Sequence, residues 1–219
     1  MTHTGSHLMR RLTPLLAVLL AGCGLGARPG VNTAPTDTSD LDPGWQVGPF
    51  ALTERSGKTV TDQDLRGNVW VASFVFTRCM GPCPAVTATV ARLQSELKDE
   101  PGVKFVTFTV DPARDDLASL NEYAKARGAD PDRWLFLTGD EATVHKVLRE
   151  QFKQGTARNP HPGQQPGDEF DHSTRLVLVD KSGVIRGLYE GLPDDRFPDG
   201  TERFEAGLAR LKAKARELA

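Results

Sequence analysis

A nearly unbroken apolar run, Val69 to Phe76, has the length of one β-strand and is rich in β-branched and aromatic side chains. Turn-forming residues bound the run, a pattern typical of a strand that is buried on both faces. Such a strand lies inside a sheet that other layers cover from both sides. The run therefore predicts a central sheet with helices packed against it.

The residues after this strand follow helical periodicity. Apolar side chains recur at spacings of four, three and four residues, and Pro84 suits the first turn of a helix. A second apolar strand over Val103–Val110 comes next, and then a helix over about 115–127 that Gly128 ends. The order strand, helix, strand, helix is the pattern of an α/β domain. The apolar face of the first helix consists of Val86, Val90, Leu93 and Leu97.

The second half of the chain continues this alternation. Trp134–Leu137 is a third strand, and Thr138 and Glu141 have the spacing of a capping box for the next helix. Residues 154–170 are polar and rich in proline, which predicts an insertion loop. The apolar face of the helix before that loop consists of Val144, Val147, Leu148 and Phe152.

Two hairpins and a terminal helix complete the pattern. Thr174–Val179 and Val184–Tyr189 flank a short turn, and Phe50–Leu52 pairs with Gly57–Val60 at the start of the domain. The predicted fold is α/β and thioredoxin-like: a central mixed β-sheet flanked by helices, with an N-terminal hairpin and an insertion loop before the C-terminal β-hairpin. The last helix carries Phe204, Leu208, Leu211 and Leu218.

The N-terminal residues have the features of a targeting segment. Arg10 and Arg11 precede an apolar stretch of about ten residues, which is too short to span a membrane but typical of a signal peptide. Leu20-Ala21-Gly22-Cys23 resembles a bacterial lipobox, whose cysteine becomes the lipid-modified first residue, and Met9 is a second candidate start. We expect a lipoprotein-type signal segment over 1–23, a flexible linker over 24–44 and a folded domain over 45–219.

This organisation predicts an extracytoplasmic protein, lipid-anchored through Cys23 to a bacterial membrane on its periplasmic or cell-surface side. The 219 residues carry 27 Lys and Arg against 29 Asp and Glu, a formal net charge of −2. Nucleic-acid binding needs clustered positive charge, so the balance argues against that class. We expect the protein to be a monomer.

Cys79 and Cys83 lie where the buried strand ends and the first helix begins. Unpaired backbone N–H groups and the helix dipole at that point favour the thiolate form of Cys83. The four-residue spacing, across a loop and a first helical turn, turns both sulfur atoms to one side. Two convergent thiolates suit a soft ion such as copper(I), and they suit a reversible disulfide equally well.

His172 follows the polar insertion and precedes a strand. In a thioredoxin-like sheet that strand runs beside the one leading to the cysteines, so the loop at its start faces them. Two cysteines and a histidine give three ligands for copper, although zinc with an added water suits the same set. Asp171 is either a partner that orients His172 or an exposed turn carboxylate.

Three motifs resemble the Sco/SenC family in order and spacing, and the resemblance covers nearly all of residues 45–219. The motifs are Phe74-Val75-Phe76-Thr77-Arg78-Cys79 with Cys83-Pro84, Val110-Asp111-Pro112-Ala113-Arg114-Asp115, and Asp171-His172-Ser173. The resemblance implies copper binding by Cys79, Cys83 and His172, and a role in building the dinuclear copper site of cytochrome c oxidase subunit II. It also implies a thiol-disulfide reductant role that is known or proposed for members of the family.

The sequence departs from the family between the cysteines. Many members carry an acidic residue there, whereas this chain has Met80-Gly81-Pro82. We interpret Met80 as a side chain at the solvent edge, with a thioether contact to copper(I) as the alternative. His161 is expected to be solvated and His145 to lie on the surface. The turn and cap before the next helix are expected to consist of Asp111, Pro112 and Asp115.

Two functions stay open. The first is an extracytoplasmic copper chaperone that passes one copper ion to apo subunit II and meets other copper carriers or thiol reductants. The second is a thiol-disulfide reductase, acting on the oxidase or on other extracytoplasmic proteins, in which Cys79 and Cys83 are the redox-active pair and His172 is not needed. A peroxiredoxin-like peroxidase is a weaker reading, because the proline-threonine pattern of that family is absent around Cys79.

Overall fold

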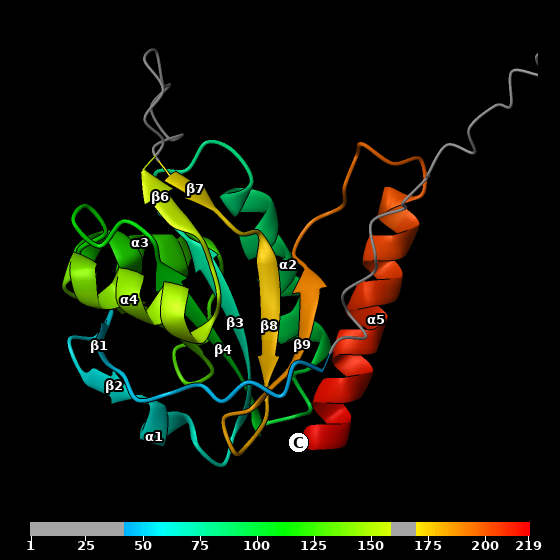
Figure 1. Cartoon of the computed structure of the whole chain (residues 1–219), viewed down its shortest axis with the longest axis horizontal. Helices are drawn as coiled ribbons and strands as arrows, with labels where there is room; N and C mark the ends of the chain where they lie inside the picture. The colour runs from blue at the N-terminus through cyan, green and yellow to red at the C-terminus, as the bar shows by residue number, and fades with distance from the viewer. Residues whose placement is uncertain (1–41, 159–169) are drawn as a thin grey trace, which may run out of the picture. The chain divides into compact units, whose positions relative to one another are not determined.

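The computed structural model describes residues 42–158 and 170–219, which belong to one compact unit that starts at Asp37. The predictions for the signal segment, for Cys23 and for His161 lie outside the described residues. Within them, seven strands form one sheet in the order β2-β1-β5-β4-β3-β8-β9, and β6 pairs with β7 in a small second sheet (Figure 1). The strands are β1 Ala51–Glu54, β2 Thr59–Thr61, β3 Val69–Val75, β4 Val103–Thr109, β5 Trp134–Thr138, β6 Thr156–Arg158, β7 Phe170–His172, β8 Arg175–Val179 and β9 Ile185–Glu190.

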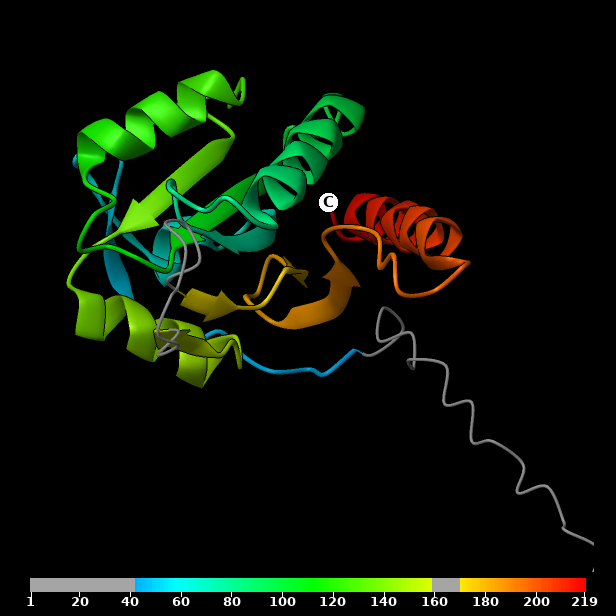
Figure 2. The same cartoon turned by 90° about the horizontal axis from the view of Figure 1, so that it is seen from above.

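Helices cover both faces of the large sheet. They are α1 Asp62–Leu65, α2 Cys83–Glu96, α3 Leu117–Ala126, α4 Glu141–Gln151 and α5 Gly200–Leu218. Strands β3, β4 and β5 are parallel neighbours, so α2 and α3, which connect them in turn, lie on the same face. Figure 2 shows α5 on that face as well, and α4 on the opposite one. This mixed sheet with helices on both sides confirms the predicted fold class.

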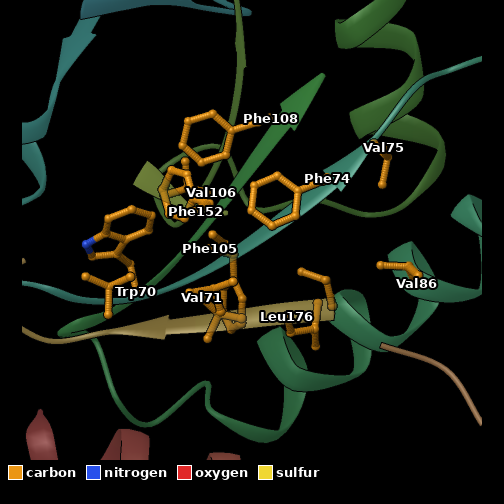
Figure 3. Close-up of a cluster of buried hydrophobic side chains, with 14 of the residues drawn as sticks. Trp70, Val71, Phe74, Val75, Val86, Phe105, Val106, Phe108, Phe152 and Leu176 are labelled. Atoms are coloured by element: carbon orange, nitrogen blue, oxygen red, sulfur yellow. The ribbon is translucent and has the colours of Figure 1, made fainter. Parts of the chain in front are cut away.

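Aromatic and aliphatic side chains of β3 and β4 are part of a buried hydrophobic cluster (Figure 3). Every residue of β3 is buried. Phe152, directly after α4, contacts Phe74 of β3 and Phe108 of β4, with ring centroids 5.4 and 5.1 Å apart. Burial of three large aromatic rings is a strong apolar contribution to stability, and it holds the end of β3 in place.

The predicted capping box before α4 is wrong. Asp140 is the N-cap, and its side chain accepts a hydrogen bond from the backbone N–H of Thr143 at 3.0 Å. Thr138 instead belongs to β5, where it pairs with Thr53 of β1. Its hydroxyl donates to the backbone carbonyl of Asp115 at 3.2 Å. Strand β5 extends one residue beyond its apolar run because these partners, remote in sequence, satisfy the hydrogen-bonding groups of Thr138.

The insertion is more regular at its ends than predicted. Residues 154–170 were expected to be a loop, yet β6 and β7 pair in antiparallel fashion, with Thr156 opposite His172. Strands of three residues are too short to show an alternating pattern, so the sequence carries little sign of them. The ribbon leads directly into β8, the antiparallel neighbour of β3. Among the described residues, no helix combines the length and apolar character needed to cross a membrane.

Candidate metal centre

Cys79 and Cys83 sit at the carboxyl end of β3, on either side of the turn into α2. The backbone N–H of Cys79 donates to the carbonyl of Phe76 at 3.2 Å. Cys83 is the first residue of α2, after Pro82 as the N-cap, and Pro84 lies in the first turn as predicted. Both side chains are buried thiols. The fold therefore shields the pair from bulk water.

The two thiols lie close enough to share a hydrogen bond. That bond with Cys79 and then burial raise the pKa of Cys83 well above its ordinary value, although a hydrogen bond with the backbone of Phe76 opposes the rise. The negative charge of nearby Asp115 adds to it. This direction is opposite to the predicted preference for a thiolate, because the hydrogen bond with Cys79 and burial both favour the protonated thiol.

Asp115 has a different role from the predicted cap. It is 1% exposed, and its carboxylate accepts hydrogen bonds from the backbone N–H of Thr77 at 3.1 Å and from the hydroxyl of Thr77 at 2.6 Å. The hydroxyl of Thr109, at the end of β4, donates to the same carboxylate. Burial raises the pKa of Asp115, and the three hydrogen bonds partly offset that rise. The cap of α3 is Asp116, which accepts from the backbone N–H of Ser119 at 2.8 Å.

Asp111 is buried beside this network. Its carboxylate forms an ion pair with Arg114, and its backbone N–H donates to the hydroxyl of Thr109 at 3.0 Å. Its turn position agrees with the sequence, but the carboxylate faces the protein interior. The sequence signal that points to this network is the placement of two aspartates directly after a buried strand, in the same motif that carries the family resemblance.

The structure describes the backbone of Asp171 and His172, in β7. Two residues earlier on this strand, Phe170 is buried against Phe76, with ring centroids 5.6 Å apart. Phe76 lies three residues before Cys79, so this contact joins β7 to the start of the cysteine loop. Of the three predicted ligands, the described side chains bring Cys79 and Cys83 together, and the role of His172 stays a prediction.

His145 is not the surface residue that the sequence suggested. Its ring is half-buried, and Nε2 lies 2.8 Å from the carbonyl oxygen of Val110. The same ring packs edge-on against Phe170, with centroids 6.0 Å apart. A lone polar residue on a helix gives no sign of such partners, because both are remote in sequence. Through this contact with Phe170, His145 joins α4 to β7, the strand before β8.

The donor set of this site fits a soft metal ion. Two sulfur donors share a hydrogen bond at one turn, and both cysteines belong to the buried hydrophobic core. Thiolate ligands select copper(I) and zinc over hard cations. The same pair can also close into a disulfide.

Comparison with known proteins places this site in context. The chain is 32% identical over 157 residues to the SCO1 protein homolog of Bacillus subtilis, covering 71% of this chain and 79% of that protein. The structure resembles that of a SCO1/SenC family lipoprotein from Bacillus anthracis, with a TM-score of 0.67, 29% identity, and coverage of 80% of this chain and 95% of that one.

Two further solved structures bear on the chemistry. BsSco, described as a member of the Sco family of cytochrome c oxidase assembly proteins with a disulfide switch, matches with a TM-score of 0.61 and 29% identity, covering 78% of this chain and 94% of that one. Bradyrhizobium japonicum ScoI with copper bound matches with a TM-score of 0.59 and 25% identity, covering 80% and 99%. The SCO1/SenC family model matches residues 40–197. The chain therefore belongs to the SCO1/SenC family.

Proposed function

We propose that this protein is a copper chaperone that holds one copper ion through Cys79, Cys83 and His172. The observation that carries the proposal is the pair of buried, mutually hydrogen-bonded thiols at the end of β3. Two sulfur ligands and one imidazole form a three-coordinate set that suits copper(I) and leaves room for another ligand in copper(II). In this proposal Asp171 orients His172 by a hydrogen bond.

The recipient in this proposal is the dinuclear copper site of cytochrome c oxidase subunit II. Support comes from a structural neighbour described as a member of a family of oxidase assembly proteins, and from another that contains copper. The protein acts as a monomer, anchored on the extracytoplasmic side of the membrane through lipid on Cys23, with residues 24–44 as its tether. The similarity to a family lipoprotein supports this location.

The protonated state of Cys83 sets a condition for copper binding. A thiol must lose its proton before it ligates a metal, so copper(I) uptake releases protons to solvent. The burial that raises the pKa of Cys83 also keeps water and competing ligands away from the bound ion. Phe170, packed on Phe76, holds the strand of His172 near the cysteine loop.

A second function, thiol-disulfide reductase, is favoured by the direct contact of the two thiols. In that reaction Cys79 and Cys83 become a disulfide while a substrate disulfide gains their two electrons and two protons as two thiols. The disulfide switch of a structural neighbour supports the same chemistry. Formation of this disulfide would remove both sulfur ligands of copper at once, so the two functions would be mutually exclusive at any moment.

The deciding experiment is an anaerobic copper(I) titration of the reduced full chain in detergent, with a copper(I) chelator as competitor. We expect one tightly bound ion per chain, loss of tight binding in Cys83→Ser, and weaker binding in His172→Ala. Cys23→Ser is the matched control, because it removes the third cysteine of the chain without touching the proposed site. Weak copper binding that is unchanged in His172→Ala, in a protein that still reduces a disulfide substrate, would instead support the reductase.

A further inference from the structure

The two cysteine ligands proposed above are recessed. Cys79 is 7% exposed and Cys83 is fully buried. A copper(I) ion carried by another protein cannot contact both sulfur atoms directly, since they lie below the surface of the turn. Exchange between soft ligands proceeds through an intermediate in which donor and acceptor ligands hold the ion together. Such an intermediate needs a soft donor atom that reaches the surface next to the thiols.

Met80 supplies that atom. Its side chain is 81% exposed, the highest value among the large apolar side chains that the structure describes as exposed. It directly follows Cys79 in the turn. The methionine thioether is a soft donor on a side chain with three rotatable bonds, so it can reach outward to a carrier and back toward the cysteines.

Gly81, the next residue in the turn, has no side chain that could cover the Cys79 sulfur. A Cβ atom built on Gly81 would lie 3.9 Å from Sγ of Cys79 and, apart from its two chain neighbours, would meet no other atom within 4 Å. Gly81 is itself exposed, and its φ does not lie in the left-handed region that favours glycine. Backbone strain therefore does not explain the glycine. Its effect is that residue 81 adds no side chain beside the Cys79 sulfur.

The distribution of sulfur in the sequence points to the same place. The chain has three cysteines and three methionines, of which Met1, Met9 and Cys23 all precede the folded domain. All sulfur after residue 23 therefore lies within the five residues from 79 to 83.

We propose that Met80 is the port through which copper(I) enters and leaves the site, an inference that rests on the proposed copper function. The thioether first takes a place on copper(I) still held by thiolate or chelator ligands of a carrier. Cys79 and Cys83 then replace the carrier ligands and release their protons to solvent, while copper stays in the +1 state. Met80 leaves last. Delivery follows the same steps in reverse.

The test is the rate of copper uptake, measured separately from affinity. The reduced full chain is mixed anaerobically with the coloured copper(I) complex of bathocuproine disulfonate, and loss of colour is followed by stopped flow. We expect Met80→Leu, which keeps size and apolarity, to slow uptake by at least about tenfold while equilibrium affinity changes by less than about threefold. Leu117→Ala, at another exposed apolar side chain, should leave both values unchanged.

A second measurement does not depend on rates. In the chain labelled with ¹³C-methyl methionine, the Met80 signal is assigned by its absence in Met80→Leu. We expect it to shift or broaden at substoichiometric copper(I), while the signals of Met1 and Met9, in a chain that keeps its signal segment, stay in place. Gly81→Val should slow uptake as well, because its side chain would cover the Cys79 sulfur.

The outcomes separate the two proposals. Unchanged uptake in Met80→Leu, with an unmoved methyl signal, would overturn the port while leaving the chaperone intact. A loss of affinity greater than about tenfold in Met80→Leu would make Met80 a resident ligand and also overturn it. If the unmodified chain takes up no copper at all, the proposed function fails and the port fails with it.

Discussion

The carboxylate of Asp115 accepts two hydrogen bonds from Thr77, one from its backbone N–H at 3.1 Å and one from its hydroxyl at 2.6 Å. Thr77 lies two residues before Cys79, and the hydroxyl of Thr109 at the end of β4 donates to the same carboxylate. A buried acceptor thus joins the loop before α3 to the loop that carries the first cysteine.

Asp115→Asn should destabilise the fold and loosen the cysteine loop. The amide group offers donors where three donors already converge, so at least one buried polar group loses its partner. We expect a loss of about 1–3 kcal/mol in the free energy of unfolding, measured by urea denaturation. Asp116→Asn is the control, since Asn caps a helix about as well as Asp. Equal stabilities of the two variants would contradict the role assigned to Asp115.

Copper(I) affinity should rise with pH. The pKa of Cys83 is raised by its hydrogen bond with Cys79 and by burial, so this thiol is protonated at neutral pH. Binding releases its proton, and mass action then favours the bound state as protons are removed. We expect the affinity to increase by at least about tenfold per pH unit between pH 6 and 8, measured by chelator competition. A flat profile would show that the ligating sulfur is already a thiolate.

Gly191→Ala should displace the segment that follows β7. A Cβ at position 191 would lie 2.2 Å from the backbone carbonyl oxygen of Thr174, two residues after His172, and 3.3 Å from Val86 of α2. Backbone at that distance must move, so we expect a lower free energy of unfolding and weaker copper binding. Gly207→Ala in α5 is the matched control, because a Cβ there meets nothing within 4 Å and alanine favours the helix. The control should keep or raise stability.

Asp180 should stabilise the β8–β9 turn in a pH-dependent way. Burial opposes its charge, but hydrogen bonds from Val184, Ser182 and Arg186 outweigh this and lower its pKa below the ordinary 3.8. Because the folded-state pKa is depressed, the contribution is present above the unfolded-state pKa and is lost as pH falls through the folded-state value.

Asp180→Asn therefore should cost about 1–3 kcal/mol in unfolding free energy at pH 7, through loss of the charge-assisted bond to Arg186. The difference from the unmodified chain should shrink below about pH 4. Urea denaturation at pH 7 and at pH 3 measures it. A difference that grows toward acid pH would reverse the sign assigned here.

The order of strands and helices could be predicted from the sequence because it depends on local periodicity. Three signals depend only on residues that are close in sequence. They are the buried run of β3, the apolar face of α2 and the glycine after α3. The motifs around Cys79, Asp115 and His172 likewise carry the family resemblance, which the comparisons confirm. The solvent-edge position of Met80 also follows from sequence, since a turn between two structural elements lies at the surface.

The remaining features depend on contacts between residues remote in sequence. The sequence predicts a helix cap at Asp115, because it does not show that the hydroxyls of Thr77 and Thr109 donate to the same carboxylate. The sequence predicts a thiolate at Cys83, because the helix dipole can be inferred locally. The burial and the hydrogen bond with Cys79 that raise the pKa of Cys83 arise only from packing. The sequence by itself determined the order of the main strands and helices and which sulfur atoms share a turn. Only the tertiary structure decided their protonation and support, because burial and long-range hydrogen bonds exist only once the sheet is assembled.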